Sequence, residues 1–340
     1  MLSERTVLVT GGGGSVGRSL ISRLLTHDID TLRILDNNEP GLASLRSDLA
    51  DDRCRFFAGD VRDRHRLSRA MNGVDVVFHT AAMKHVDICE YNPFEAVKTN
   101  TLGLQKVIDA AVDADVSRFV FTSSDKAVDP ANTMGTTKLL GEKLVTAGND
   151  YSGGSDISLA SVRFGNVINS SRSVIPLFVD QIREGGPVTL TDERMTRFFL
   201  TYDDVFELVT DAAASTTSGE VFVHKMPALQ IVDLAEAMIE TLAPRFGHDP
   251  AEIDIDVIGP RPGETFHEEI MTEREAARAY ENDAMFAIPP EATEMRTPTT
   301  PDGFEPATDI VRSSKHASKL SQSEIVSLLE TNEVIPTTNE

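Results

Sequence analysis

The feature that most constrains this chain is a glycine-rich segment between an apolar strand-like run and an amphipathic helical pattern. The run is Thr6–Thr10, the segment reads Thr10-Gly-Gly-Gly-Gly-Ser-Val-Gly17, and apolar residues at helical spacing continue to Leu25. Glycines 11, 14 and 17 allow a tight turn and a close backbone approach to a pyrophosphate, which the N-terminus of a helix favours through its free N–H groups and dipole. The pattern predicts a dinucleotide site containing Gly11, Gly14, Ser15, Val16 and Gly17.

Further apolar runs alternate with helical patterns through the first half of the chain. Strand-like runs lie at 32–36, 55–60, 74–79, 119–123 and 158–163, and long helical stretches lie at 93–114 and 132–147. Strands separated by helices favour parallel pairing with right-handed crossovers. We therefore predict an α/β fold with a doubly wound parallel sheet. We expect a dinucleotide-binding domain at 1–165 with return segments near 195–225, and a smaller α/β substrate domain at 166–330 with an exposed loop at 289–308.

The end of the second predicted strand indicates which dinucleotide binds. Asp36 lies 19 residues after Gly17, where a carboxylate accepts hydrogen bonds from the adenosine ribose and repels a 2′-phosphate. No Arg or Lys occurs among residues 37–40 to hold such a phosphate. This favours NAD over NADP. Contacts with the cofactor are also expected from residues that end the third and fourth strands, namely Asp60, Val61, Ala81 and Ala82.

Composition excludes several classes of protein. The net charge of −22 would repel nucleic acid and anionic membranes, so we expect neither as a partner. Two cysteines are too few for a disulfide scaffold or a cysteine-rich zinc site, and we expect no metal. The absence of a signal peptide and of a membrane-length apolar run predicts a cytoplasmic protein. Only nine lysines accompany the acidic residues, a composition that resembles proteins of a high-salt, halophilic cytoplasm.

A polar cluster follows the fifth predicted strand, at the edge where doubly wound sheets bind ligands. It reads Ser123-Ser124-Asp125-Lys126, and Lys138 follows one helical region later. Together these residues resemble the extended short-chain dehydrogenase/reductase superfamily, whose Tyr-x-x-x-Lys signature places two side chains one helical turn apart. Met134 stands at the tyrosine position here. A thioether cannot exchange a proton, so this departure either removes activity or moves proton transfer to other groups.

Seven further motifs are similar to those of the UDP-N-acetylglucosamine 4,6-dehydratase family, also described as CapD-like polysaccharide biosynthesis proteins. In chain order they are AAMKHV (81–86), CEYNP (89–93), SDKAV (124–128), RFGNV (163–167), SVIPLF (173–178), MTRFF (195–199) and RPGE (261–264). The resemblance extends from residue 7 to about residue 329, and several branches of the family have methionine at the tyrosine position. Two branches of the family differ in retaining or inverting the configuration at C5. Asp36 and Met134 resemble the long membrane-anchored branch, whereas residues 222–227 and 313–315 resemble the short soluble branch, so the stereochemistry stays open.

The resemblance implies a chemistry in which hydride passes from C4 of a UDP-N-acetylhexosamine to NAD, water is lost across C5 and C6, and hydride returns to C6. It implies Asp125 as the acid, Lys126 as the base, and Lys138 as a ligand of the nicotinamide ribose. The pKa of such a lysine must fall and that of the aspartate must rise. Ser123 or Ser124 is expected to bind a sugar hydroxyl. The C4 hydroxyl could lose its proton to Asp125, to Ser124 or to water.

The family also implies how the nucleotide is held. Arginine suits a diphosphate because its guanidinium matches phosphate oxygens in a bidentate fork. The positions that match are Arg197 and Arg261 for the diphosphate, Asn166 beside it, Glu264 for the uridine ribose and Lys84 for the substrate. Arg172 replaces a glycine of the relatives, which we expect to reshape its loop or to add a phosphate contact.

Two other functions fit the same sequence. A UDP-sugar 4-epimerase would need only oxidation and reduction at C4, which leaves Asp125 and Lys126 without a task. A protein that binds NAD without turnover would account for Met134 but not for the Asp-Lys pair. The stretches at 93–114 and 132–147 match the helices that this superfamily uses for dimerisation, so a homo-oligomer is expected.

Overall fold

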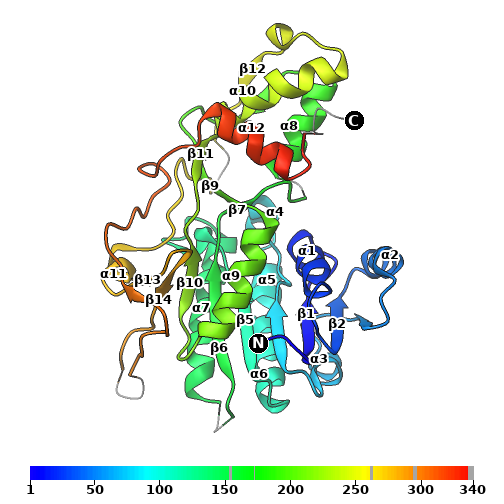
Figure 1. Cartoon of the computed structure of the whole chain (residues 1–340), viewed down its shortest axis with the longest axis vertical. Coiled ribbons are helices and arrows are strands. Elements are labelled where there is room, and N and C mark those ends of the chain that lie inside the picture. The colour runs from blue at the N-terminus through cyan, green and yellow to red at the C-terminus, as the bar shows by residue number, and fades with distance from the viewer. Residues whose placement is uncertain (153–154, 172, 261–262, 294–296, 336–340) are drawn as a thin grey trace. The chain divides into compact units, whose positions relative to one another are not determined.

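The computed structural model of the chain describes residues 1–152, 155–171, 173–260, 263–293 and 297–335. They form two compact units, whose segments can be followed by colour in Figure 1. The first unit comprises Met1–Arg163, Tyr202–Lys225 and Met271–Ile310, and the second comprises Phe164–Thr201, Met226–Ile270 and the chain from Val311 onward. Residues 271–310, which we placed in the second domain, lie in the first unit because their strands extend its sheet.

The first unit is built on a ten-stranded sheet. Seven strands are parallel and lie in the order β3 (Cys54–Ala58), β2 (Thr31–Asp36), β1 (Thr6–Thr10), β4 (Val76–His79), β5 (Arg118–Thr122), β6 (Ser158–Arg163) and β10 (Val221–His224). The antiparallel strands β14 (Met285–Ile288), β13 (Tyr280–Glu281) and β15 (Glu305–Pro306) extend the sheet beyond β10. The order 3-2-1-4-5-6 confirms the predicted doubly wound sheet, in which ligands bind where the strand order reverses at β1.

Helices cover both faces of this sheet because its central strands are apolar on both sides. On one face α1 (Ser15–Leu24) packs beside α9 (Tyr202–Ser215), which crosses β5 and β6. Figure 1 shows α9 in front of the sheet. On the other face, α3 (Arg64–Met71), α6 (Leu104–Asp113) and α7 (Thr133–Asp150) close a core. Helices thus cover the two faces of the sheet, and loops follow the carboxyl ends of its strands.

Shorter elements connect these helices and strands. Helix α2 (Glu39–Leu49) follows β2, and α4 (Val86–Tyr91), α5 (Pro93–Ala96) and the π-helix η1 (Val97–Gly103) lie between β4 and α6. A single 3-10 turn, η2 (Asp125–Ala127), follows β5, and α11 (Glu273–Ala276) precedes β13. The predicted helix over 93–114 is therefore three consecutive helical elements.

The second unit has a small sheet and a cover of helices. Its central strand β9 (Thr196–Leu200) lies between β7 (Asn166–Val167) and β11 (Ala228–Gln230), and β8 (Val188–Leu190) pairs in parallel with β12 (Ile255–Val257). Helices α8 (Val174–Arg183), α10 (Ile231–Leu242) and α12 (Gln322–Thr331) enclose one apolar core with these strands. Two 3-10 turns, η3 (Ala243–Phe246) and η4 (Pro250–Glu252), follow α10.

The segment predicted as an exposed loop at 289–308 is only partly exposed, which corrects the prediction. Phe304 is buried, and its ring lies 5.9 Å from the ring of Phe222 on β10. Glu305 and Pro306 pair with β13 as strand β15. Burial of an aromatic side chain anchors this segment to the sheet edge despite its polar composition.

Among the described residues, no helix combines the length and the apolar character that crossing a bilayer requires.

Candidate active site

The glycine-rich turn after β1 is packed too closely for side chains at two positions. Gly11 has φ of +73°, and a Cβ there would lie 2.6 Å from the backbone nitrogen of Ala81. A Cβ at Gly17 would lie 2.2 Å from the carbonyl oxygen of Gly11. The turn therefore lies directly against the segment that follows β4, where Ala81 and Ala82 keep the surface small.

The N-terminus of α1 opens at this turn and can receive an anion. Gly14 is the N-cap and supplies no side-chain acceptor, so the first N–H groups of the helix donate no hydrogen bond to a capping side chain. Ser15 and Val16 form the first turn of the helix. A helix of this kind favours negative charge at its N-terminus. The cradle that Gly11 and Gly17 form therefore fits the pyrophosphate of a dinucleotide.

Asp36 lies at the end of β2, beside the glycine turn. Its Oδ2 accepts a hydrogen bond from the N–H of Gly13 at 2.8 Å, and its Oδ1 accepts one from the N–H of Asn38 at 2.8 Å. These bonds hold the carboxylate beside the glycine turn, and its contact with the ribose stays a prediction. Arg18 of α1 also reaches this region, where it donates to the carbonyl oxygens of Gly13 and Gly41, whereas our sequence prediction considered only residues 37–40.

Asp60 and Val61, predicted to contact the cofactor, have partners within the protein. Asp60 forms a two-pronged pair with Arg62, at 2.9 Å to Nε and 2.6 Å to Nη2, and the hydrogen bonds from Arg62 lower the pKa of Asp60. Val61 is buried in the core between α3 and α6. Both side chains thus have partners of their own, and their contact with the cofactor stays a prediction.

The Asp125–Lys126 pair forms directly after β5, in turn η2. The Nζ of Lys126 lies 3.2 Å from Oδ1 of Asp125, and the hydroxyl of Ser124 donates to the same oxygen at 2.6 Å. The Asp125 side chain is 1% exposed, whereas the Lys126 side chain is 31% exposed. The pair thus joins a buried carboxylate to an amine that solvent or substrate can reach.

Helix α7 fixes the backbone of this turn. A Cβ on Gly135 would lie only 2.0 Å from the carbonyl oxygen of Lys126, so the first turn of α7 touches η2 with no room for a side chain. Asn132 caps α7 by accepting from the N–H of Gly135 at 2.8 Å. A bare backbone at position 135 is therefore a condition for the observed place of Lys126.

Ser123, predicted with Ser124 as a ligand of the sugar, is instead part of a buried ionic network. Its hydroxyl donates to Glu142 at 2.6 Å, and its side chain is inaccessible. Arg163 of β6 binds both oxygens of Glu142, at 2.8 and 2.6 Å, and both oxygens of Glu275 on α11, at 3.0 and 2.8 Å. Because Ser123 is committed to this network, only Ser124 stays a candidate for the sugar hydroxyl.

Lys138 is buried one helical turn beyond the start of α7. Its Nζ donates to the carbonyl oxygen of Thr122 at 2.7 Å and lies 4.7 Å from the centre of the Phe121 ring. Burial lowers the pKa of Lys138 to about 8. His79, at the end of β4, has its pKa lowered to about 3, first by burial and then by the charge of Lys138. A neutral imidazole therefore lies near this ammonium group.

Met134 faces a small apolar cluster. Its side chain is buried with Cys89 and Ala96, and Met83 and Val86 pack against them. The π-helix residue Asn100 holds the neighbouring segment by bonding both backbone groups of Met83, at 2.8 and 2.9 Å. We included Met134 among the catalytic positions, and the structure places its thioether in packing, where it moves no proton.

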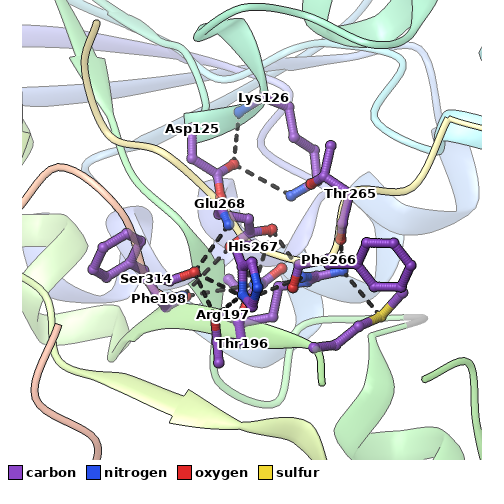
Figure 2. A network of polar contacts seen from close by, with 12 residues as sticks. Asp125, Lys126, Thr196, Arg197, Phe198, Thr265, Phe266, His267, Glu268 and Ser314 are labelled. Carbon is purple, nitrogen blue, oxygen red and sulfur yellow. Dashed lines mark hydrogen bonds and ion pairs between the residues drawn. The ribbon is translucent and has the colours of Figure 1, made fainter. Parts of the chain in front are cut away.

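In the second unit, Arg197 is surrounded by acceptors of its own unit (Figure 2). Its guanidinium donates to the carbonyl oxygens of Thr196, Phe266 and Thr265 at 2.9, 3.2 and 2.9 Å, and its Nε lies 3.3 Å from Glu268. Arg197 thus clamps the segment 265–268 onto β9. Arginine donors engaged in this way are not available to a diphosphate without rearrangement, which differs from the sequence prediction.

Three other predicted substrate residues have different surroundings. Asn166 lies 3.2 Å from the carboxylate of Glu268, beside the Arg197 clamp. Lys84 is exposed between β4 and α4, and Glu264 is exposed immediately before the clamped segment. Arg261 and Arg172 lie outside the described residues.

Comparison with known protein families shows to which family the chain belongs. The family described as polysaccharide biosynthesis protein matches residues 7–290. The chain belongs to this family. The resemblance that we drew from the motifs is therefore confirmed.

Several known proteins are similar to this chain over most of its length. A protein of Methanocaldococcus jannaschii named an uncharacterized membrane protein is 48% identical over 84% of this chain and 86% of its own length. A UDP-glucose 4-epimerase of Rickettsia felis is 38% identical over 87% of this chain and 86% of its own. A UDP-N-acetylglucosamine 4,6-dehydratase (inverting) of Campylobacter jejuni is 39% identical over 85% of this chain and 84% of its own.

Two solved structures resemble the polysaccharide biosynthesis fold described above. The X-ray structure of Pen from Bacillus thuringiensis is 38% identical, with a TM-score of 0.89 over 98% of this chain and 99% of that chain. The dTDP-glucose 4,6-dehydratase DesIV from Streptomyces venezuelae, with NAD and TYD bound, is 26% identical, with a TM-score of 0.68 over 77% of this chain and 86% of that chain.

Sequence reasoning missed several residues that shape the site of this family member. Gly135, Glu142 and Asn100 position the turn after β5 and the segment after β4, and Arg18 reaches the region of Asp36. Gly135 lies one position after Met134, and Glu142 lies four positions after Lys138. Their spacing from the two signature positions could therefore have identified them. Asn100 gave no such signal because a π-helix has no sequence pattern that we can recognise.

Proposed function

We propose that this chain is an NAD-dependent enzyme of nucleotide-sugar metabolism, and specifically that it dehydrates a UDP-N-acetylhexosamine as a UDP-N-acetylglucosamine 4,6-dehydratase. The family and the Campylobacter jejuni relative support this class of reaction. The glycine cradle at Gly11 and Gly17 and the carboxylate of Asp36 would hold NAD, the dinucleotide present in the DesIV structure. When bound, NAD supplies hydride transfer at the sugar carbons.

The observation that carries the proposal is the contact between Asp125 and Lys126. Elimination of water needs a base at C5 and an acid at C6, close to each other. Transfer of one proton from the ammonium of Lys126 to the carboxylate of Asp125, across their 3.2 Å contact, converts the ion pair into a neutral amine and a neutral acid. Burial of Asp125 disfavours its charged form and so favours this exchange.

The proton balance of the elimination then closes on these two residues. Lys126 takes the C5 proton and becomes charged, while Asp125 gives its proton to the departing C6 hydroxyl, which leaves as water. The pair ends as the ion pair that the structure shows. Ser124 stabilises that state because its hydroxyl donates to Asp125 at 2.6 Å. Lys138 would bind the nicotinamide ribose from its buried place on α7.

The nucleotide would be held by the second unit. Asn166 and Glu264 supply an amide and a carboxylate, and Arg197 fixes the segment that follows Glu264 rather than offering free donors. By their match to the family motifs, Arg261 would bind the diphosphate and Lys84 would contact the substrate. We propose this division because the diphosphate needs hydrogen-bond donors other than those with which Arg197 already holds segment 265–268.

A UDP-sugar 4-epimerase is the second candidate, favoured by the Rickettsia felis relative. Incubation of the protein with UDP-N-acetylglucosamine, followed by mass spectrometry and NMR of the product, separates the functions. A 4-keto-6-deoxy product supports the dehydratase, and UDP-N-acetylgalactosamine supports the epimerase. An unchanged sugar, with NAD bound, would indicate a protein without turnover.

The role of Lys126 has its own test. Lys126→Ala should abolish the 4-keto-6-deoxy product while NAD content stays at the wild-type level, because the residue acts on the sugar and not on the cofactor. Lys143→Ala, at an exposed lysine of α7, is the matched control and should keep full activity. An active Lys126→Ala enzyme would show that another group removes the C5 proton.

We also propose that the protein forms a homo-oligomer through the helices around α7. Helices α4, α5 and η1 pack against α7, and these elements expose large apolar side chains. Exposed fractions are 46% for Ile88, 87% for Tyr91, 64% for Phe94, 49% for Leu102 and 45% for Leu140. Apolar side chains gathered on neighbouring helices are typical of a protein interface.

A further inference from the structure

Arg18 ties the glycine turn to the start of α2. Its Nε donates to the carbonyl oxygen of Gly13 at 3.2 Å, and its Nη2 donates to the carbonyl oxygen of Gly41 at 2.9 Å. The remaining nitrogen lies 3.5 Å from Asp48 of α2, a weak and exposed contact. The side chain is 34% exposed, so one edge of the guanidinium stays accessible.

The two segments that Arg18 joins are the segments that hold Asp36. Gly13, whose carbonyl accepts from Arg18, gives its N–H to Asp36 at 2.8 Å. Asn38, whose N–H donates to Asp36, accepts in turn from the N–H of Gly41 at 3.0 Å. Arg18, Gly13, Asp36, Asn38 and Gly41 therefore form a closed ring of hydrogen bonds. A change in Arg18 is transmitted to the carboxylate through backbone groups.

The ring places one anion and one cation at the place where NAD and NADP differ. An acidic residue at the end of the second strand binds the 2′-hydroxyl and repels a 2′-phosphate, whereas an arginine nearby accommodates that phosphate. Both residue types are present here. The planar fork of an arginine suits phosphate oxygens, and Arg18 spends two of its nitrogens on neutral carbonyls, which are weaker acceptors than a phosphate.

We propose that Arg18 and Asp36 together determine which dinucleotide the protein accepts. In the protein as it stands, Arg18 is a positioning residue that holds Asp36 against the glycine turn, so that NAD is bound and NADP is excluded. When the Asp36 carboxylate is removed, the same guanidinium becomes the ligand of the 2′-phosphate. This inference rests on the proposed NAD-dependent function.

A double-mutant cycle tests the coupling. Apoprotein is prepared for the wild type, Asp36→Ser, Arg18→Met and the double variant, and dissociation constants of NAD⁺ and NADP⁺ are measured by calorimetry. Asp36→Ser should bind NADP⁺ about tenfold more tightly than wild type does, as expected for one new charge-assisted hydrogen bond. Adding Arg18→Met should remove most of that gain. Arg18→Met alone should weaken NAD⁺ a few-fold, on the order of one lost positioning contact, without creating NADP⁺ binding.

Two further variants guard the interpretation. Arg46→Met removes an exposed arginine of α2 and should leave the NADP⁺ gain of Asp36→Ser intact, which excludes a general charge effect. Arg18→Lys keeps the charge without the fork, and in the Asp36→Ser background it should keep only part of the gain even if Arg18→Met folds poorly. An equal gain with and without Arg18 overturns the inference while NAD⁺ binding still supports the proposed function. A wild-type protein that binds neither dinucleotide overturns both.

Discussion

Arg163 offers the sharpest prediction, because it is a buried charge held by two acidic residues. Its side chain is 2% exposed, and the partners Glu142 and Glu275 are 3% and 13% exposed. Four hydrogen bonds of 2.6–3.0 Å join the guanidinium to the two carboxylates. Arg163→Met keeps much of the volume but leaves both carboxylates without their cation.

The magnitude follows from the stranded charges rather than from the lost bonds alone. Removal of one partner from a buried ion pair costs about 3–5 kcal/mol. The pKa of Glu275 gives an independent figure. Burial would raise it, but the hydrogen bonds and charge of Arg163, with help from Thr272, bring it to about 2. Relative to an unfolded value near 4.5, this depression contributes about 3 kcal/mol that is present above pH 4.5 and lost as pH falls through 2.

Urea unfolding at pH 8 should therefore show Arg163→Met less stable than wild type by about 3–5 kcal/mol. Without the cation the carboxylates bind protons more readily when folded, so the deficit should shrink between pH 8 and pH 5. The triple variant Arg163→Met/Glu142→Gln/Glu275→Gln removes the stranded charges and should recover about 2 kcal/mol or more of the loss. A deficit below about 1 kcal/mol, or a triple variant no more stable than the single one, would refute the reasoning.

Three other predictions follow from single features of the first unit. Gly135→Ala should lower product formation at least about tenfold with NAD still bound, because its Cβ would displace Lys126, whereas Gly148→Ala on the same helix meets only side-chain atoms and should be active. Lys138 has a folded pKa of about 8 against 10.5 unfolded, so wild-type stability should rise by up to about 3 kcal/mol between pH 8 and 10.5, and Lys138→Met should lack this rise in urea unfolding. Phe94→Glu/Leu140→Glu should shift the protein to a smaller species in light scattering, while Leu177→Glu, an exposed leucine of the second unit, should not; an unchanged mass for the first variant places the interface elsewhere.

The sequence allowed the parallel sheet to be predicted because its information is local. Each central strand is a continuous apolar run, each crossover helix has apolar residues at helical spacing, and a glycine turn joins β1 to α1. The helical pattern that we followed to Leu25 corresponds to helix α1, Ser15–Leu24. By contrast, β13 and β15 are two residues long and have no pattern of their own. They form because the edge of a neighbouring strand is available for pairing, which is a tertiary interaction that the local sequence does not show.

The sequence could not show which groups the polar side chains bind in the folded protein. Asp125 and Lys126 are adjacent in the chain, so their pairing was open to inspection. Arg163 and Glu275 are 112 residues apart, and apart from the carbonyl oxygen of Thr196 the acceptors named above for Arg197 lie 68 residues or more away. Ser123 was therefore assigned to the substrate from its place at a strand end, and Arg197 from its match to the family, although the fold engages the polar groups of both residues elsewhere. Residue chemistry predicts what a group can bind, and only the fold determines what it does bind.

The surroundings of the two lysines explain why the proton chemistry is assigned to Lys126 and not to Lys138. The Nζ of Lys138 contacts a neutral carbonyl oxygen at 2.7 Å, which can accept a hydrogen bond but cannot take up a proton. The low pKa of Lys138 therefore favours its neutral amine, but the carbonyl partner does not take up the proton and so does not become an acid. The Nζ of Lys126 contacts a buried carboxylate at 3.2 Å, so each proton that leaves the amine creates an acid at the neighbouring atom. Met134 cannot give a proton to either lysine. The proposed elimination needs a base and an acid next to each other. Of these two lysines, Lys126 is the one that forms an ion pair with a carboxylate among the described residues, and this supports its role in the proposed elimination.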